Sequence, residues 1–273
     1  MTIPGDPYDT SAFDMRQFTL TAQGAFRSEL DLAPFETAPL RSDDLRLLRH
    51  LGLLESATME NLRNVLVTAT HKDARVTAFL VTWAFEKFWL ADALDAVLEA
   101  HGQPRLRDEE EGPRRRSPSE AAERRGPITR ALEAINKGVP IVAEHMTAGL
   151  VDEWVMGEGY SALDVRAGSP ALTAVLDRVR AVKARHEQFF EIESTWRLRD
   201  SPRAVKQTRA SLVRAVFPIG AVERADADRT AFETAVWGGA EGHVRADSVG
   251  ERVAALPGLD DRVGSAVTRK LTS

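Results

Sequence analysis

The fold is decided by residues 73–101, which read DARVTAFLVTWAFEKFWLADALDAVLEAH. An aspartate opens this segment, and Gly102 and Pro104 follow it, as is typical of the two ends of a helix. Its central part is apolar on nearly every face, and a helix of that kind lies in the interior of a protein. Glu86 stands inside it, and a buried carboxylate must be paired, protonated or bound to a metal.

Helical periodicity extends over most of the remaining chain. It predicts long helices at residues 42–54, 58–70, 128–163 (divided at Pro140), 170–198 and 202–217, and short ones at 228–237, 247–256 and 260–271. No alternation typical of strands is present. The sequence therefore predicts an all-α protein with a bundle of long helices in its middle.

Composition divides the chain into three parts. Residues 1–40 hold four prolines and little periodicity, so we expect an extended N-terminal arm. Residues 41–217 form the helical bundle. The stretch 103–127, QPRLRDEEEGPRRRSPSEAAERRGP, is almost free of apolar residues, which predicts a mobile charged linker inside the bundle. Residues 218–273 are expected to form an appendage of short helices packed on the bundle.

The overall composition excludes several classes of protein. The 273 residues include no cysteine, which rules out a thiolate metal site, a cysteine nucleophile and a disulfide scaffold. A net charge of −5 argues against a general nucleic-acid binder. The first ten residues lack the pattern of a signal peptide, and charges interrupt the apolar run at 76–98. We expect a cytoplasmic protein that does not span a membrane.

Three ionisable residues lie on apolar stripes of different predicted helices: Glu86, Glu153 and His186. Helical bundles build carboxylate metal sites in this way, from side chains on facing helices. Oxygen and nitrogen ligands of this kind suit a hard or borderline metal ion.

The segments around these residues resemble helices of the ferritin-like di-iron carboxylate proteins, especially the acyl-carrier-protein desaturases. Residues 83–94 (WAFEKFWLADAL) look like the second helix of that family, 152–163 (DEWVMGEGYSAL) like the third and 182–190 (VKARHEQFF) like the fourth. The resemblance implies a ferritin-like four-helix bundle with extra N- and C-terminal helices. It also implies a metal site held by Glu86, Glu153, His186 and a first-helix glutamate, either Glu55 or Glu60. We favour Glu60, which we expect to lie level with Glu86 on an antiparallel helix.

Two positions depart from the family pattern. Trp89 stands where the second helix should carry histidine, and Lys183 stands where the fourth helix should carry glutamate. We expect the Lys183 ammonium to occupy the space of a metal ion and to pair with Glu86 or Glu153, while the Trp89 ring fills the remaining volume. The metal site is then degenerate and holds no cofactor. Iron or manganese is the alternative.

These features favour a binding or structural module, with an apolar small molecule as one expected ligand. The pocket for it is expected to be lined by Trp83, Trp89, Tyr160 and Phe190. The glycines on the Glu153 helix fit either an open pocket or close helix packing. We also expect a homo-oligomer.

Two other functions stay open. The first is an active di-iron or di-manganese carboxylate oxidoreductase of the desaturase or oxygenase type. The second is nucleic-acid binding, since residues 253–267 resemble a helix-hairpin-helix element. Asp260 and Asp261 would repel a phosphate there, so we do not expect nucleic acid as a partner.

Overall fold

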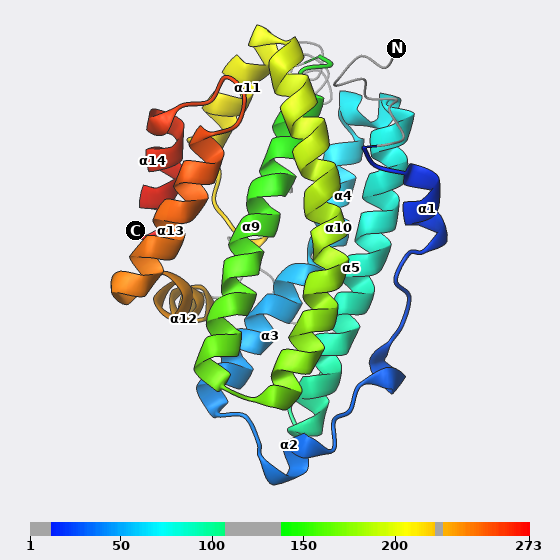
Figure 1. The fold of residues 1–273 in the computed structure, drawn as a ribbon, viewed down its shortest axis with the longest axis vertical. Coiled ribbons are helices and arrows are strands. Elements are labelled where there is room, and N and C mark those ends of the chain that lie inside the picture. Colours follow the sequence, from blue (N-terminus) through cyan, green and yellow to red (C-terminus); the bar gives the residue numbers. More distant parts are fainter. Residues whose placement is uncertain (1–11, 107–137, 222–225) are drawn as a thin grey trace.

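The computed structural model describes residues 12–106, 138–221 and 226–273. Over these ranges the chain forms helices and loops without any strand, which confirms the all-α prediction (Figure 1). No helix within them is both long and apolar enough to cross a membrane.

Four long helical segments form the bundle that positions the site. The first segment combines α3 (Ser42–Ser56) and α4 (Thr58–Leu66), and the others are α5 (Ala74–Ala100), α9 (Ile141–Ala167) and α10 (Pro170–Asp200). Helix α3 packs along α5 and α9 packs along α10 (Figure 1). The four inward faces therefore meet in one core.

Side-chain caps begin the helices at the predicted places. The carboxylate of Asp73 accepts the backbone N–H of Val76 at 3.0 Å, which satisfies one of the free donors at the start of α5. Ser169 and Ser201 cap α10 and α11 (Pro202–Leu212) in the same way, each followed by a proline in the first turn. Asp43 and Asp44 lie in the first turn of α3 as expected, although Ser42 itself makes no capping hydrogen bond.

The part of the chain before the bundle is less extended than expected. It contains α1 (Met15–Leu20), the 3₁₀ helix η1 (Arg27–Glu29) and the single-turn α2 (Pro34–Thr37), joined by extended segments. Four aromatic side chains fix it to the bundle, since these are at most 6% exposed: Phe13, Phe18, Phe26 and Phe35. Most of the predicted charged linker, and the first residues of the helix expected from 128, lie outside the described residues.

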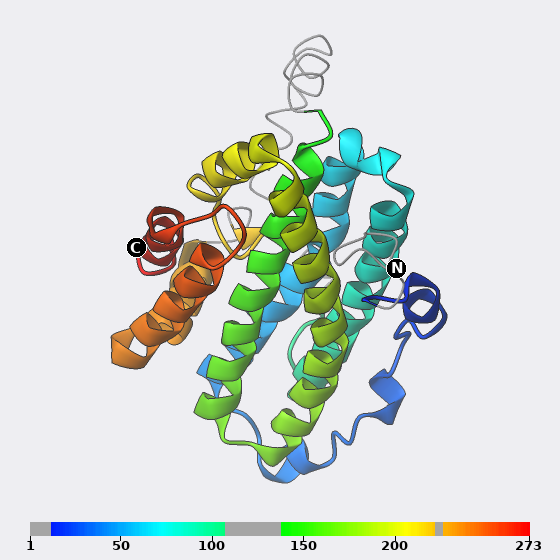
Figure 2. The same ribbon diagram turned by 45° about the horizontal axis from the view of Figure 1, so that its top comes forward.

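The C-terminal part consists of α12 (Asp226–Trp237), α13 (Gly239–Ala254) and α14 (Asp261–Leu271). These helices lie on the side of the bundle opposite α5 (Figure 2). Helix α13 begins at 239 rather than at the expected 247, because Gly238 and Gly239 separate it from α12 while Gly242 serves close packing within the helix. A Cβ on Gly242 would lie 2.2 Å from the backbone of Trp237, so only glycine allows this approach.

The last two helices form a hairpin whose turn is unsuited to phosphate binding. The side chain of Asp260 accepts the backbone N–H of Val263 at 3.2 Å, at the N-terminus of α14. That N–H is one of the donors a phosphate would use, and a carboxylate already occupies it. The hairpin therefore packs as part of the fold, and its charge opposes the nucleic-acid alternative.

Candidate functional site

A cluster of charged side chains lies in the core of the bundle, and all four helical segments contribute to it. Each member is at most 6% exposed. We call this set the ion-pair cluster: Glu55, Glu86, Lys87, Asp152, Glu153, Lys183 and His186. Charges removed from water to this extent are stable only when they are paired and hydrogen-bonded.

Lys183 of α10 lies at the centre of the ion-pair cluster. Its Nζ is 2.5 Å from Glu153 Oε2 and 3.1 Å from Glu55 Oε1, so the ammonium joins α3 to α9. Of the two partners expected from the sequence, it contacts Glu153 and not Glu86. Burial lowers the pKa of Lys183, but the carboxylates of Glu153 and Glu55 outweigh burial and raise this pKa above its ordinary value.

The carboxylates respond to Lys183 in the opposite direction. Burial alone raises the pKa of Glu153, but the Lys183 and Lys87 ammonium groups hold it well below its usual range. The same two lysines hold the pKa of Glu55 below its usual value against the effect of burial. Both glutamates are therefore anionic at neutral pH, and the cluster consists of ions and not of neutral acids.

Lys87 is a second buried ammonium, which the sequence analysis missed. Its Nζ is 3.0 Å from Glu55 Oε2 and 3.8 Å from Asp152 Oδ2, and it lies over the Trp83 ring at 5.0 Å from the ring centre. The signal was present in the sequence. Lys87 directly follows Glu86 in a helix that is apolar nearly all round, so neither side chain can lie on a wholly polar face.

Glu86 and His186 form the second half of the ion-pair cluster. His186 Nε2 is 2.7 Å from Glu86 Oε2, and because a carboxylate only accepts, this nitrogen donates. The other oxygen of Glu86 accepts the backbone N–H of Gln23 at 2.7 Å and the guanidinium of Arg185. His186 Nδ1 lies 3.7 Å from Glu153 Oε1. The structure thus brings together the three residues Glu86, Glu153 and His186, as the sequence predicted.

Two aromatic donors complete the hydrogen bonding of the glutamates. The Trp83 indole N–H donates to Glu153 Oε1 at 2.9 Å, and the Tyr160 hydroxyl donates to Glu55 Oε1 at 2.7 Å. Burial, together with the charge of Glu55, raises the pKa of Tyr160 well above its ordinary value. Tyr160 is therefore a neutral donor in the ion-pair cluster.

Asp152 differs from the other carboxylates of the ion-pair cluster. Burial raises its pKa from 3.8 to about 6, and the charge of Lys87 and the hydrogen bond from the Ile219 N–H offset burial only in part. That N–H donates to Asp152 Oδ1 at 2.7 Å and connects the cluster to the loop after α11. The carboxyl group of Asp152 therefore titrates much closer to neutral pH than that of a free aspartate.

The structure places Glu55, one of the two first-helix candidates, in the cluster and corrects the position expected for Trp89. The first-helix glutamate of the cluster is Glu55 on α3, whereas Glu60 lies on α4 and its side chain is outside the described residues. Trp89 does not fill the site, because it lies on the outer side of α5 against Phe88, with ring centres 4.9 Å apart. Trp83, six residues earlier on α5, points into the core instead of Trp89.

The residues of the ion-pair cluster do not fit a dimetal centre. Two lysine ammonium groups lie between the carboxylates, and a protonated lysine is no ligand. The oxygens of Glu86 are engaged by Arg185, His186 and Gln23, as given above. Among the described side chains, no group of three or more histidines and acidic residues is placed to hold a metal ion. A metal would have to displace both lysines.

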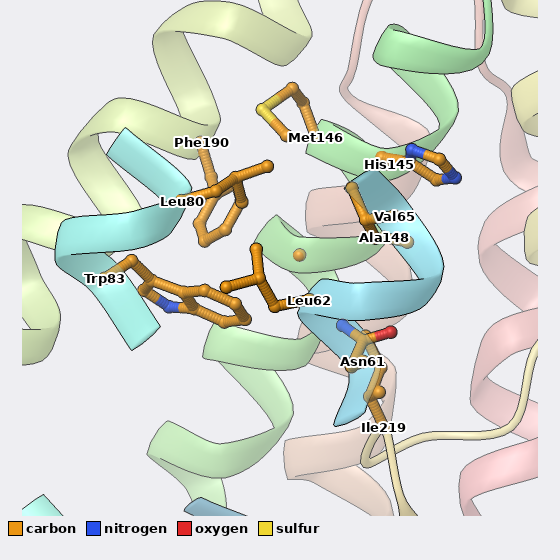
Figure 3. Close-up of a pocket in the computed structure, with 11 residues that line it drawn as sticks. Asn61, Leu62, Val65, Leu80, Trp83, His145, Met146, Ala148, Phe190 and Ile219 are labelled. Carbon is orange, nitrogen blue, oxygen red and sulfur yellow. The ribbon is translucent and has the colours of Figure 1, made fainter. Parts of the chain in front are cut away.

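A small pocket adjoins the ion-pair cluster and has a volume of about 60 Å³ (Figure 3). Helices α4, α5, α9 and α10 supply its walls, which are mostly apolar: Leu62, Val65, Leu80, Trp83, Met146 and Phe190. Asn61 and His145 are the polar residues among them. Trp83 belongs to both sites, since one part of it lines the pocket while its N–H donates to Glu153.

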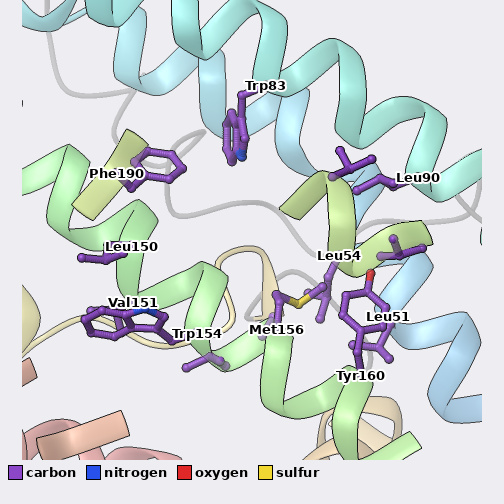
Figure 4. Close-up of a cluster of buried hydrophobic side chains, with 14 of the residues drawn as sticks. Leu51, Leu54, Trp83, Leu90, Leu150, Val151, Trp154, Met156, Tyr160 and Phe190 are labelled. Atoms are coloured by element: carbon purple, nitrogen blue, oxygen red, sulfur yellow. The ribbon is translucent and has the colours of Figure 1, made fainter. Parts of the chain in front are cut away.

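Two of the four expected pocket residues, Trp83 and Phe190, line this pocket, whereas Tyr160 donates to Glu55 of the ion-pair cluster and Trp89 lies outside. Figure 4 shows Trp83, Phe190 and Tyr160 among the buried aliphatic side chains. Gly149 lines the pocket and packs closely against Phe190, because a Cβ there would lie 2.5 Å from the Phe190 ring. Gly157 has nothing within 4 Å of such a Cβ, so the two glycines have different roles.

Comparison of the chain with family models, with curated proteins and with solved structures finds no match.

Proposed function

We propose that this protein is a ferritin-like helical bundle in which buried lysines replace the metal ions, and that it acts as a metal-independent binding module for a small, mainly apolar molecule. One observation carries this proposal. The Lys183 ammonium lies between Glu55 and Glu153, which belong to two different helical segments of the bundle. In a carboxylate-bridged centre a metal ion would occupy such a position.

The ion-pair cluster gives the bundle an internal cross-link that needs no metal. Breaking one side of a buried ion pair costs about 3–5 kcal/mol, so such a network strongly favours the one arrangement of helices that satisfies it. The hydrogen bond from Trp83 to Glu153 fixes the position of the Trp83 side chain, which forms part of the pocket wall. A preorganised wall lowers the entropy cost of binding.

The size and lining of the pocket support one class of ligand. A cavity of about 60 Å³ admits a short hydrocarbon group and not a fused ring system. The mostly apolar walls favour the hydrocarbon part, while Asn61 and His145 favour one polar group. A short-chain alcohol or acid has this pattern.

Metal content tests the first half of the proposal. The protein is purified from cells grown with added iron and manganese, its metal content is measured, and its melting temperature is recorded with and without Fe²⁺ and Mn²⁺ under anaerobic conditions. We expect substoichiometric metal and an unchanged melting temperature. A stoichiometric metal, or a rise in melting temperature with either ion, would support the oxidoreductase alternative and refute the proposal.

Ligand binding tests the second half. The probes are 1-alkanols from ethanol to 1-hexanol, and the readout is the ¹⁹F signal of 5-fluorotryptophan at position 83, assigned by its loss in Trp83→Phe. We expect a saturable shift in the wild type, which Val65→Phe abolishes by filling the pocket from α4. Val67→Phe is the matched control, because Val67 is 78% exposed. No saturable shift in the wild type, or the same shift in Val65→Phe, would refute the ligand site.

A further inference from the structure

The outer face of α5 carries an apolar stripe that is left open in the described part of the chain. We define the α5 stripe by its residues: Ala74, Ala78, Val81, Phe85 and Phe88. Val81, Phe85 and Phe88 are 52%, 46% and 56% exposed. Trp89 packs against both phenylalanine rings and widens the apolar surface. Contiguous exposed apolar surface of this kind marks an interaction site in soluble proteins.

The stripe is regular. Its residues follow one another at alternating intervals of four and three positions, and Asp92 continues the series beyond Phe88. This is the spacing of a seven-residue repeat, which brings one face of a helix against a second helix along its length. The core-facing residues of α5 already serve the bundle, so the repeat on the outer face indicates a second partner.

We propose that the α5 stripe binds the α5 stripe of a second copy of this chain, with the two helices antiparallel about a two-fold axis between Val81 and Phe85. The axis brings Val81 of each copy level with Phe85 of the other, and Ala78 level with Phe88. In antiparallel pairs of this spacing the two alternating core positions face each other in this way. Small residues then lie opposite large ones, which allows the surfaces to interlock.

The ends of the stripe agree with an antiparallel arrangement. Lys72 is exposed just before the stripe, and Asp92, which is partly exposed and also pairs with Arg27 at 3.4 Å, ends it. The same two-fold axis brings the lysine of one copy near the aspartate of the other, and opposite charges at the rim fix register and orientation. A parallel arrangement would place Lys72 near Lys72 and Asp92 near Asp92, and like charges in contact are unfavourable.

The exposed area suits a weak dimer. A fully buried phenylalanine removes about 150–250 Å² from water, so the two half-exposed rings still offer roughly 200 Å² per copy. With Val81, the alanines and the edge of Trp89, we take roughly 350 Å² of apolar area per copy. Because about 60% of an interface is apolar, the dimer buries about 1,100–1,200 Å² in total, at the small end of specific interfaces. Interfaces of this small size are typical of weak, transient complexes.

Sedimentation velocity tests the association, with the full chain at concentrations from below to well above micromolar. We expect a reversible monomer–dimer equilibrium in the wild type and a monomer at every concentration in Phe85→Glu and in Phe88→Glu. Val244→Glu, at a site on α13 that is 68% exposed, is the control and should dimerise like the wild type. Circular dichroism melting verifies that each variant is folded. A wild type that stays monomeric throughout, or a dimer that persists in both phenylalanine variants, would overturn the proposal.

Disulfide trapping tests the register. The chain has no cysteine of its own, so any disulfide that forms must join the introduced thiols. We expect the double variant Val81→Cys, Phe85→Cys to form a covalent dimer on mild oxidation, because the axis makes these positions level. The single variant Val81→Cys should not, because its two copies are separated along the helix axis by four residues, about 6 Å, in addition to the distance between the helices. Efficient cross-linking of the single variant alone would refute the antiparallel axis.

Discussion

Replacement of Lys183 by methionine removes the central cation of the ion-pair cluster while keeping a side chain of similar length. Its Nζ contacts two buried carboxylates, at 2.5 Å and 3.1 Å. Glu55 keeps Lys87 and Tyr160 as partners. Glu153 keeps the Trp83 N–H, the more distant His186 and the attraction of the Lys87 charge but loses its contacting cation, so the cost falls mainly on Glu153.

The expected loss of stability follows from this unequal loss of partners. Leaving one side of a buried ion pair uncompensated costs about 3–5 kcal/mol, which for a chain of this size lowers the melting temperature by roughly 10 °C. Thermal and urea unfolding followed by circular dichroism measure it. Lys206→Met is the matched control, because Lys206 is an exposed lysine on α11, and it should change stability by at most about 0.5 kcal/mol.

Two further measurements separate the lost ion pair from a simple packing defect. Adding Glu153→Gln to Lys183→Met removes the unpaired charge, so we expect it to recover about 2–3 kcal/mol in a double-mutant cycle. Acid should reduce the effect of Lys183→Met, because protonation neutralises the stranded carboxylate. If Lys183→Met melts within two degrees of the wild type, the reasoning on the ion-pair cluster is wrong, and equal damage with and without Glu153→Gln would also refute it.

Three other substitutions test separate parts of the core. Lys183→Glu should unfold more readily than Lys183→Met by like-charge crowding, and Fe²⁺ or Mn²⁺ should restore part of its melting temperature, although incompletely because Lys87 remains; no response to either ion would contradict the ferritin-like interpretation. Asp152→Asn should gain stability relative to the wild type as the pH rises from about 4 to 6. The folded wild type keeps a proton up to about pH 6 while the unfolded chain loses it near 3.8, a difference worth about 3 kcal/mol; parallel pH–stability curves would count against the raised pKa of Asp152. Gly149→Ala should lower the free energy of unfolding by about 1–3 kcal/mol, because its methyl group meets the Phe190 ring, and calorimetry would disprove this if the alanine variant melted with the wild type.

The helical bundle itself was readable from local signals. Asp73, Ser169 and Ser201 each precede the start of a long helix, and their side chains make the capping hydrogen bonds that such positions predict. These contacts join residues three positions apart, so they depend on nothing beyond the segment itself. The late start assigned to α13 shows the limit of this approach, since a glycine is normally taken as a helix breaker, whereas Gly242 lies within α13 and allows close contact with the Trp237 backbone.

The candidate site was only partly readable. Glu86, Glu153, Lys183 and His186 stand out because an ionisable residue on an apolar helix face is unusual, and the structure brings all four into one cluster. The sequence did not determine the partner of each residue, because the partner depends on the rotation of each helix about its axis. Trp83 and Trp89 are six positions apart on the same helix, yet one points into the core and the other lies outside.

The sequence by itself determined that this protein is helical and that ionisable groups must be buried in its centre. Helix type depends on capping and periodicity within each segment, and the energy of a buried charge depends on the apolar residues around it, so both are local properties. Only the tertiary structure decided that Glu55 joins Lys183, that Lys87 adds a second cation, and that an apolar stripe stays on the outer face of α5. These features depend on which faces of four helices meet, and packing between segments far apart in the chain sets that choice.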